Sequence, residues 1–435
     1  MLERLKQHID KNLPFLKGKK LLIACSGGLD SVVMTYLFKD MGFDIGLAHC
    51  NFSLRGSESD GDEAFVTDLA EKLNIPSYVE TFDTREYADT RKLSIQMAAR
   101  ELRYLWFDEI LRDFHCDFLL TAHHADDNLE TLFINLSRGT GLRGLTGIPE
   151  QSDNLVRPLL PFSRDEILKY AKEERYFWRE DSSNKEIDYL RNAIHHDVIP
   201  PLKRHIPKLL KSLEKTQGHL RESQSLLEDY LVLIRQLVMV EQEDGYSINI
   251  SKISNLPNTE ALLYELLRPF GFTAWKDISE LIHAQSGKFI VSASHRLVKD
   301  RDLLLLTEIP LEDNAEETEI LRTTKRIEHP IPLIISSVVT KGVNTDKEIF
   351  VDANTLTYPL KVRRWRGGDY FYPIGMQGKK KLSKYFKDEK LSLVAKEKIW
   401  LLCSGEQIVW IIGHRADDRY KVGPETTQIK RIHTS

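Results

Sequence analysis

The chain has 435 residues, of which 41% are apolar and 29% charged, and this composition is typical of a soluble protein with several domains. No apolar run approaches a membrane span and the first residues show no signal-peptide core, so we expect a cytoplasmic protein that binds no membrane. The four cysteines stand singly without a C-x-x-C pair, which argues against a disulfide framework and against a zinc site.

The first 205 residues alternate strand and helix patterns. Apolar runs predict strands at 19–25, 44–50, 77–82, 117–122 and 155–160, and helical spacing predicts helices at 30–38, 63–73, 85–114 and 125–137. This alternation is typical of an α/β domain with a mainly parallel sheet, helices on both faces and a ligand site at the carboxyl ends of the strands. We therefore expect the loop after residue 25 and the histidine-rich segment after residue 122 to meet at that edge.

The remainder of the chain divides into smaller parts. Helical spacing predicts a connecting helix at 206–240, and mixed patterns predict a small domain at 245–310 with helices at 261–267 and 274–284. The acidic stretch 308–319 reads as a linker, and short strands follow it, with helices near 382–386 and 393–399. We predict an α/β domain at 1–205, a helical linker with a small second domain at 206–310, and a C-terminal α+β domain at 325–435.

The charge is distributed unevenly along the chain. The net charge is −4, but residues 361–435 contain 17 basic and 8 acidic side chains, a net charge of +9 against −13 for the rest. A basic module attached to an acidic body is typical of a protein that binds nucleic acid through one part. The alternative interpretation, a solvated charged face, stays open.

A glycine-rich turn, Ser26-Gly27-Gly28-Leu29-Asp30-Ser31, follows the first predicted strand and leads into a helix. Two consecutive glycines allow a close approach of the backbone to a ligand, and the N–H groups of the first helical turn favour an anion. The spacing is neither a Walker A motif nor the dinucleotide fingerprint. The turn is similar to the PP-loop of ATP pyrophosphatases, in which it holds the pyrophosphate of ATP; an ordinary glycine turn is the alternative.

Acidic side chains gather at the start of the predicted helix 125–137. Asp126, Asp127 and Glu130 lie at helical spacing on one face, more acids than helix capping needs. Asp30 is either a helix cap or a Mg²⁺ ligand, and Asp127 could supply a second carboxylate for that ion. The preceding His123 and His124 lack zinc-binding spacing, so we expect hydrogen bonds to phosphate.

Further segments resemble the tRNA(Ile)-lysidine synthetases, a family of PP-loop enzymes. In order and spacing the match covers 26–31, 48–60, Arg103-Tyr104, 123–131, 141–149, 157–160, 181–184 and Arg191-Asn192, and it resumes at 365–369 and 378–382. The resemblance implies that ATP adenylates the C2 carbonyl oxygen of the wobble cytidine in a CAU-anticodon tRNA(Ile). The ε-amine of free L-lysine then attacks that carbon, AMP leaves, and the codon read changes from AUG to AUA.

The resemblance also implies roles for individual residues. The catalytic set is Asp30, Arg103, Asp127 and Glu130, with Mg²⁺ held by Asp30 and Asp127. ATP binding is assigned to Ser26, Gly27, Gly28, Leu29, Asp30, Ser31, Ala48, His49 and His123. Arg103 would provide a cation for developing charge, or a surface ion pair. Glu130 would orient the lysine amine and accept its proton, or act as a metal ligand or cap, and His49 could equally be a packing residue.

The tRNA contacts are expected from two regions. Those near the pocket are Arg55, Arg138, Arg143 and Arg191, and those in the basic C-terminal run are Arg364, Arg366, Lys379, Lys380 and Lys381. Two positions depart from the family pattern, because Phe52 stands where His is common and His195 stands where Arg is common. The second departure removes one expected contact to RNA. The oligomeric state stays open, with a homodimer as one option.

Two other functions are weighed against this one. A PP-loop tRNA thiolase shares the His-His-x-Asp-Asp block but needs paired or catalytic cysteines, and the cysteines here are isolated. A non-catalytic RNA-binding protein on a degenerate PP-loop scaffold would not need the loop, Asp30, Asp127 and Glu130 together. We therefore favour the ligase.

Overall fold

The computed structural model describes residues 1–179, 190–309 and 317–434. The chain forms two compact units, Met1–Glu228 and Asp229–Ser435. Within the described ranges, no helix is both long and apolar enough to cross a membrane.

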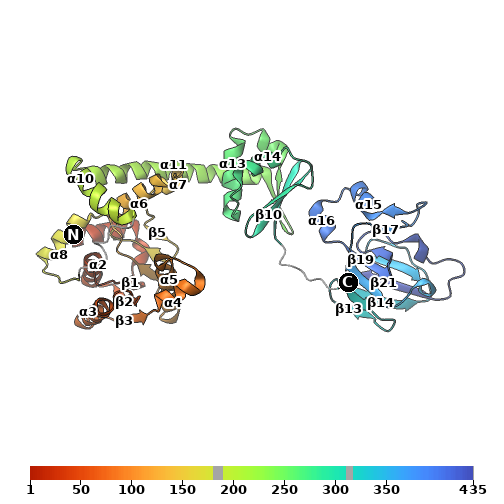
Figure 1. The fold of residues 1–435 in the computed structure, drawn as a ribbon, viewed down its shortest axis with the longest axis horizontal. Helices are drawn as coiled ribbons and strands as arrows, with labels where there is room; N and C mark the ends of the chain where they lie inside the picture. The colour runs from red at the N-terminus through yellow and green to blue at the C-terminus, as the bar shows by residue number, and fades with distance from the viewer. Residues whose placement is uncertain (180–189, 310–316, 435) are drawn as a thin grey trace. The chain divides into compact units, whose positions relative to one another are not determined.

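The N-terminal unit is built on a six-stranded sheet of order β3-β2-β1-β4-β6-β5 (Figure 1). All neighbouring strands are parallel except the edge pair β5 and β6. The strands are β1 (Lys20–Ala24), β2 (Asp44–Asn51), β3 (Ser77–Thr81), β4 (Phe118–Leu120), β5 (Gln151–Ser152) and β6 (Leu155–Val156). This confirms the predicted α/β class with a mainly parallel sheet.

Helices cover both faces of this sheet. They are α1 (Leu2–Asn12), α2 (Leu29–Asp40), α3 (Ser57–Leu73), α4 (Thr84–Arg91), α5 (Ile95–Asp113), α6 (Ala125–Ser137), α7 (Leu142–Leu145) and α8 (Arg164–Glu173). Leu21 and Ile23 of β1 pack with α1, α2, α3 and α8, whereas Leu22 packs with α5. Because side chains alternate along a strand, one apolar run supplies the cores of both faces.

Two predicted elements differ from the structure. The helix expected at 85–114 is two helices, because Lys92 adopts a left-handed φ of 55° and the Ser94 hydroxyl accepts from the Met97 N–H to begin α5. The strand expected at 155–160 covers only Leu155–Val156, since Leu159 and Phe162 instead bury themselves in the core. The motif 181–184 lies outside the described residues.

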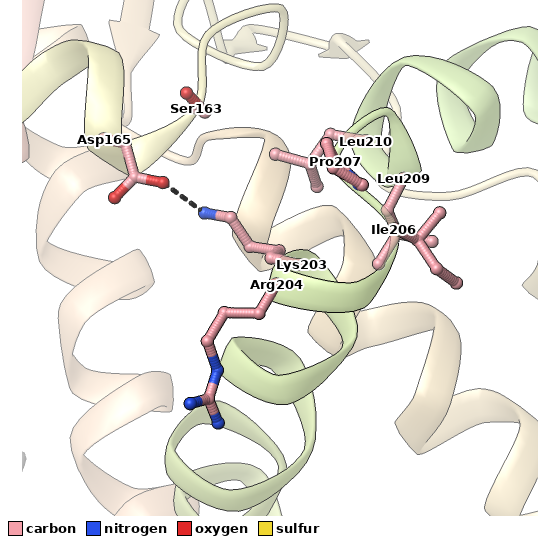
Figure 2. A pocket seen from close by; sticks show the side chains of 8 residues that line it. All are labelled: Ser163, Asp165, Lys203, Arg204, Ile206, Pro207, Leu209 and Leu210. Carbon is pink, nitrogen blue, oxygen red and sulfur yellow. Dashed lines mark hydrogen bonds and ion pairs between the residues drawn. The ribbon is translucent and has the colours of Figure 1, made fainter.

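Further helices follow in the same unit. They are α9 (Leu190–Ala193), the π-helical turn η3 (Ile194–Val198), α10 (Ile199–His205) and the long α11 (Leu209–Val238). A cavity of about 410 Å³ lies where α8, α10 and α11 begin or end, lined by Ser163, Asp165, Lys203, Arg204, Ile206, Pro207, Leu209 and Leu210 (Figure 2). None of the residues expected in the site lines it.

The C-terminal unit contains two groups of strands. The first is a five-stranded antiparallel sheet of order β7-β8-β11-β10-β9, formed by β7 (Met239–Gln242), β8 (Gly245–Asn249), β9 (Phe289–Val291), β10 (His295–Asp300) and β11 (Leu303–Glu308). It carries the helices α12 (Ile250–Ser254), α13 (Thr259–Leu267) and α14 (Trp275–Leu281). The linker expected at 308–319 falls largely on 310–316, outside the described residues.

The second group forms two four-stranded sheets, β12-β16-β19-β20 and β13-β14-β21-β15, and the hairpin β17-β18. Their bounds are β12 (Thr318–Ile320), β13 (Arg326–Ile327), β14 (Leu333–Val338), β15 (Glu348–Asp352), β16 (Leu360–Arg364), β17 (Tyr370–Phe371), β18 (Lys380–Lys381), β19 (Trp400–Ser404), β20 (Gln407–Ile411) and β21 (Ile429–Thr434). The helices α15 (Leu382–Asp388) and α16 (Leu393–Glu397) overlap the two stretches predicted as helical.

Candidate functional site

The glycine loop joins β1 to α2 at the carboxyl edge of the sheet. Gly27 has a φ of +82°, and a Cβ there would lie 3.3 Å from Phe65 and 3.5 Å from Val66 of α3. Both the backbone conformation and the close packing therefore require glycine. The Gly28 N–H donates to Ser26 Oγ over 3.3 Å and Ser31 Oγ donates to the Gly28 carbonyl over 3.0 Å, so the loop is braced by its own hydroxyls.

His49 lies at the end of β2, next to this loop. Its side chain is 5% exposed and its Nδ1 donates to the Cys25 carbonyl over 2.9 Å. Burial lowers the pKa of His49. This contact supports the glycine loop from behind, whereas Ala48 is buried in the core of the opposite face.

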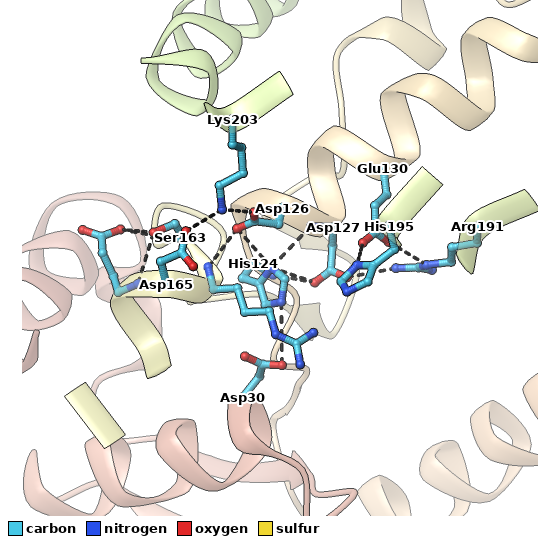
Figure 3. A network of polar contacts seen from close by, with 12 residues as sticks. Asp30, His124, Asp126, Asp127, Glu130, Ser163, Asp165, Arg191, His195 and Lys203 are labelled. Atoms are coloured by element: carbon cyan, nitrogen blue, oxygen red, sulfur yellow. Dashed lines mark hydrogen bonds and ion pairs between the residues drawn. The ribbon is translucent and has the colours of Figure 1, made fainter. Parts of the chain in front are cut away.

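His124 connects the carboxylates of two strand ends (Figure 3). It caps α6 in a reciprocal capping box, in which the Asp127 N–H donates to His124 Nδ1 over 3.3 Å and the His124 N–H donates to Asp127 Oδ2 over 2.9 Å. The other ring nitrogen lies 3.7 Å from Asp30 Oδ2 on α2. The two segments expected to meet at the sheet edge therefore do meet.

The electrostatics of this group follow from its burial. For His124, burial opposes the charged form, but the hydrogen bond to Asp30 and the charges of Asp127, Asp30 and Asp126 raise its pKa. For Asp127, burial raises the pKa but the neighbouring His124 and His123 and the Arg191 charge outweigh it, so its pKa is lowered. Burial lowers the pKa of His123 to about 4, so His123 is a neutral hydrogen-bonding group near pH 7.

Arg191 and His195 complete the cluster from the far side of α6. Arg191 donates from Nη2 to Asp127 Oδ1 and from Nε to Glu130 Oε2, both over 2.9 Å, and His195 Nδ1 contacts Glu130 Oε1 over 2.5 Å. Glu130 is 3% exposed, and both of its oxygens are engaged. His195 therefore contacts a carboxylate, and Arg191, expected at the tRNA, lies on the acidic cluster itself.

Asp126 points the other way from its neighbour and has a structural role. Its Oδ2 accepts from the Arg164 N–H over 2.8 Å, and its Oδ1 accepts from Lys203 Nζ over 2.6 Å. Lys203 also donates to Asp165 over 2.7 Å. This bridge from α10 to α6 and α8 was not found from the sequence, because no local pattern marks Lys203.

Arg103 lies on α5 with neutral partners in the described contacts. Its guanidinium carbon is 5.1 Å from the centre of the Phe52 ring, and it hydrogen-bonds the thiol of Cys50. A cation–π contact orients the guanidinium without neutralising it. Phe52, the residue that departs from the family pattern, thereby supports the arginine.

The remaining expected tRNA contacts are spread over both units. Arg55 pairs with Asp62 over 3.0 Å, Arg143 pairs with Glu228 over 3.0 Å, and Arg138 is exposed at the end of α6. In the C-terminal unit, Arg364 stacks on Trp400, Arg366 pairs with Glu317, and Lys380 pairs with Asp388 over 2.8 Å. Lys379 lies 5.3 Å from the Tyr370 ring centre, and Lys381 is exposed.

Asp30 and Asp127 were the expected metal ligands. Among the described residues, no group of three His, Cys, Asp or Glu side chains could hold a metal ion alone. Asp30 Oδ1, however, is buried without a hydrogen-bond partner in the described contacts. A buried carboxylate oxygen of this kind fits an ion that takes its other ligands from phosphate and water, which is the usual environment of Mg²⁺.

Comparisons with known proteins agree along the chain. Residues 1–202 match the PP-loop domain, 241–309 the TilS substrate binding domain and 360–433 the TilS substrate C-terminal domain. A tRNA(Ile)-lysidine synthase of Parabacteroides distasonis is 39% identical, covering 99% of this chain and 98% of that protein. One of Bacteroides thetaiotaomicron is 38% identical, covering 98% of each.

A solved structure resembles the chain more distantly. The U34-tRNA thiolase NcsA from Methanococcus maripaludis, with its 4Fe-4S cluster, has a TM-score of 0.43 at 21% identity, covering 51% of this chain and 78% of that chain. This likeness is too low to carry an argument about function. The full-length matches, by contrast, show that the chain belongs to the tRNA(Ile)-lysidine synthase family.

Proposed function

We propose that this enzyme ligates L-lysine to carbon 2 of the wobble cytidine in a CAU-anticodon tRNA(Ile), so that the tRNA reads AUA in place of AUG. The observation that carries the proposal is the meeting of Asp30, His124 and Asp127 beside the glycine loop, in a chain that belongs to this family throughout its length.

The first step is attack on ATP. The cytidine O2 forms a bond to the α-phosphorus, the bond to the β,γ-pyrophosphate breaks, and pyrophosphate leaves. The N–H groups at the start of α2 and the hydroxyls of Ser26 and Ser31 face this leaving group, and His123, neutral at pH 7, donates or accepts a hydrogen bond at the phosphates. Arg103 supplies an unneutralised cation for the developing charge.

Mg²⁺ fits the same site. Asp30 and Asp127 would hold it together with phosphate oxygens, and when bound it would supply positive charge to the phosphates. Arg191 and His124 meanwhile hold Asp127 in place.

The second step joins lysine to the base. The ε-amine of lysine forms a bond to carbon 2 of the adenylated cytidine, the bond from carbon 2 to oxygen breaks, and AMP leaves with that oxygen. The amine has a pKa of about 10.4 in water, so a proton must leave it before attack. Both oxygens of Glu130 already accept from Arg191 and His195, so we assign Glu130 to holding these two groups, which revises its expected role as proton acceptor.

The cysteines disfavour the thiolase alternative. Burial raises the pKa of Cys25 and Cys116, raises that of Cys50 to about 12 and raises that of Cys403 to about 11. Thiols with raised pKa values are poor nucleophiles and poor metal ligands at neutral pH. Sulfur transfer therefore lacks a suitable group among the cysteines.

The test is incubation with Mg-ATP, radiolabelled lysine and CAU-anticodon transcripts of tRNA(Ile) or tRNA(Met). We expect lysine in tRNA(Ile) alone, with AMP and pyrophosphate released. Asp127→Ala should abolish incorporation, whereas Asp165→Ala, which removes an exposed carboxylate of the neighbouring network, should keep it. AMP formation stimulated by tRNA without lysine incorporation would contradict the proposed nucleophile.

A further inference from the structure

The glycine loop is held from outside by a segment that follows α8. The Arg179 N–H donates to the Gly27 carbonyl over 2.9 Å. A trans peptide is planar, so its C=O and N–H point in opposite directions. Anchoring the Gly27 carbonyl therefore fixes the direction of the Gly28 N–H, one of the donors that faces the pyrophosphate position.

The Arg179 backbone is itself positioned by its side chain. The Arg179 Nε donates to Asp62 of α3, whose side chain is 12% exposed. The neighbouring Gly61 leaves room for this contact, because a Cβ there would lie 3.0 Å from the Arg179 guanidinium. Two residues 117 positions apart in the sequence are thus locked together beside the loop.

Asp62 has a second cationic partner. Its Oδ2 accepts from Arg55 Nη2 over 3.0 Å, and Arg55 belongs to the loop after β2, where tRNA binding is expected. The same helix packs directly on the loop, since Phe65 and Val66 are the nearest neighbours of Gly27. One carboxylate therefore holds segments on both sides of the nucleotide site.

We propose that Asp62 is a positioning residue of the ligase, which orients the pyrophosphate-binding amide of the glycine loop through Arg179. The inference rests on the proposed use of ATP at this loop. Asp62 acts on the β- and γ-phosphates only, because the peptide it orients lies at the pyrophosphate end of the nucleotide. Nucleotides without those phosphates are insensitive to it.

The experiment compares binding of two nucleotides to the full-length protein without tRNA or lysine, by calorimetric titration in Mg²⁺. α,β-Methylene-ATP has the pyrophosphate and resists cleavage, and AMP lacks it. The variants are Asp62→Asn, Asp62→Glu as the conservative rescue, and Arg179→Gln. Asp68→Asn, an exposed acid on the same helix, is the matched control. Arg179 is 40% exposed, so Arg179→Gln decides the question if Asp62→Asn does not fold.

We expect Asp62→Asn and Arg179→Gln to weaken α,β-methylene-ATP by about tenfold or more, the effect of losing a charge-assisted hydrogen bond, with AMP affinity unchanged. Asp62→Glu should restore part of the affinity, and Asp68→Asn should match the wild type. Equal losses for AMP and the analogue, or no loss for either, would overturn the proposal. Wild-type binding of the analogue without lysidine formation would refute the proposed function while leaving this inference intact.

Discussion

Lys203→Met should destabilise the N-terminal unit through the carboxylate that it leaves behind. Lys203 Nζ lies 2.6 Å from Asp126, whose side chain is 5% exposed, and 2.7 Å from Asp165, whose side chain is 76% exposed. Methionine keeps the length of the side chain but removes its charge. The buried Asp126 would then retain only the Arg164 N–H as a partner.

The magnitude follows from these exposures. Removing one member of a buried ion pair costs about 3–5 kcal/mol, and the lower end applies here because Lys203 is 25% exposed and Asp126 keeps one donor. We therefore expect a loss of about 2–3 kcal/mol. Asp165→Ala removes an exposed partner of the same lysine and should cost less than about 1 kcal/mol.

Calorimetric unfolding of the two variants checks this ranking. In a unit of this size, about 2–4 °C of Tm corresponds to each kcal/mol, so Lys203→Met should lower the Tm of its transition by about 4–12 °C. Asp165→Ala should lower it by a few degrees at most. A Lys203→Met shift no larger than that of Asp165→Ala would refute the claim that the bridge matters through Asp126.

Three further predictions concern pH, catalysis and tRNA binding. Burial lowers the pKa of His123 to about 4, below the value of about 6.5 in the unfolded chain, so the unfolded state binds more protons between these values. Stability should fall by up to about 3 kcal/mol as pH drops from about 6.5 to 4, and denaturant midpoints of His123→Gln should depend less on pH in that window. Arg103→Ala should lower the rate of tRNA-dependent AMP formation by about 10²–10³, whereas Arg112→Ala on the same helix should not; equal rates for both would contradict the assignment of Arg103. Replacing Lys379 and Lys381 by alanine should reduce the salt dependence of tRNA affinity by roughly 0.7–0.9 per lost phosphate contact, with an unchanged slope counting against this patch.

Local sequence patterns predicted the elements around the site. The apolar run before Ser26 and the helical spacing after Asp30 each lie within a few consecutive residues, so β1, the glycine loop and α2 could be placed from the sequence. The helix Ala125–Ser137 was likewise placed correctly, because its capping signals are local. The meeting of these two segments followed from the general rule for parallel sheets.

Contacts between distant segments could not be predicted in this way. Arg191 reaches Glu130 across 61 positions, Lys203 reaches Asp126 across 77 and Arg179 reaches Asp62 across 117. Each depends on how helices pack on the sheet, and single basic residues carry no pattern that shows their partner. Arg191 was therefore expected at the tRNA, although it lies on the acidic cluster.

Mass spectrometry of the wobble nucleoside tests the central claim most directly. CAU-anticodon tRNA(Ile) and tRNA(Met) transcripts would be incubated with the enzyme, Mg-ATP and lysine, and then digested to nucleosides. The account predicts lysidine from the wobble position of tRNA(Ile) and unmodified cytidine from tRNA(Met). An unmodified wobble cytidine in tRNA(Ile) despite AMP formation, or a thiolated pyrimidine in its place, would contradict it.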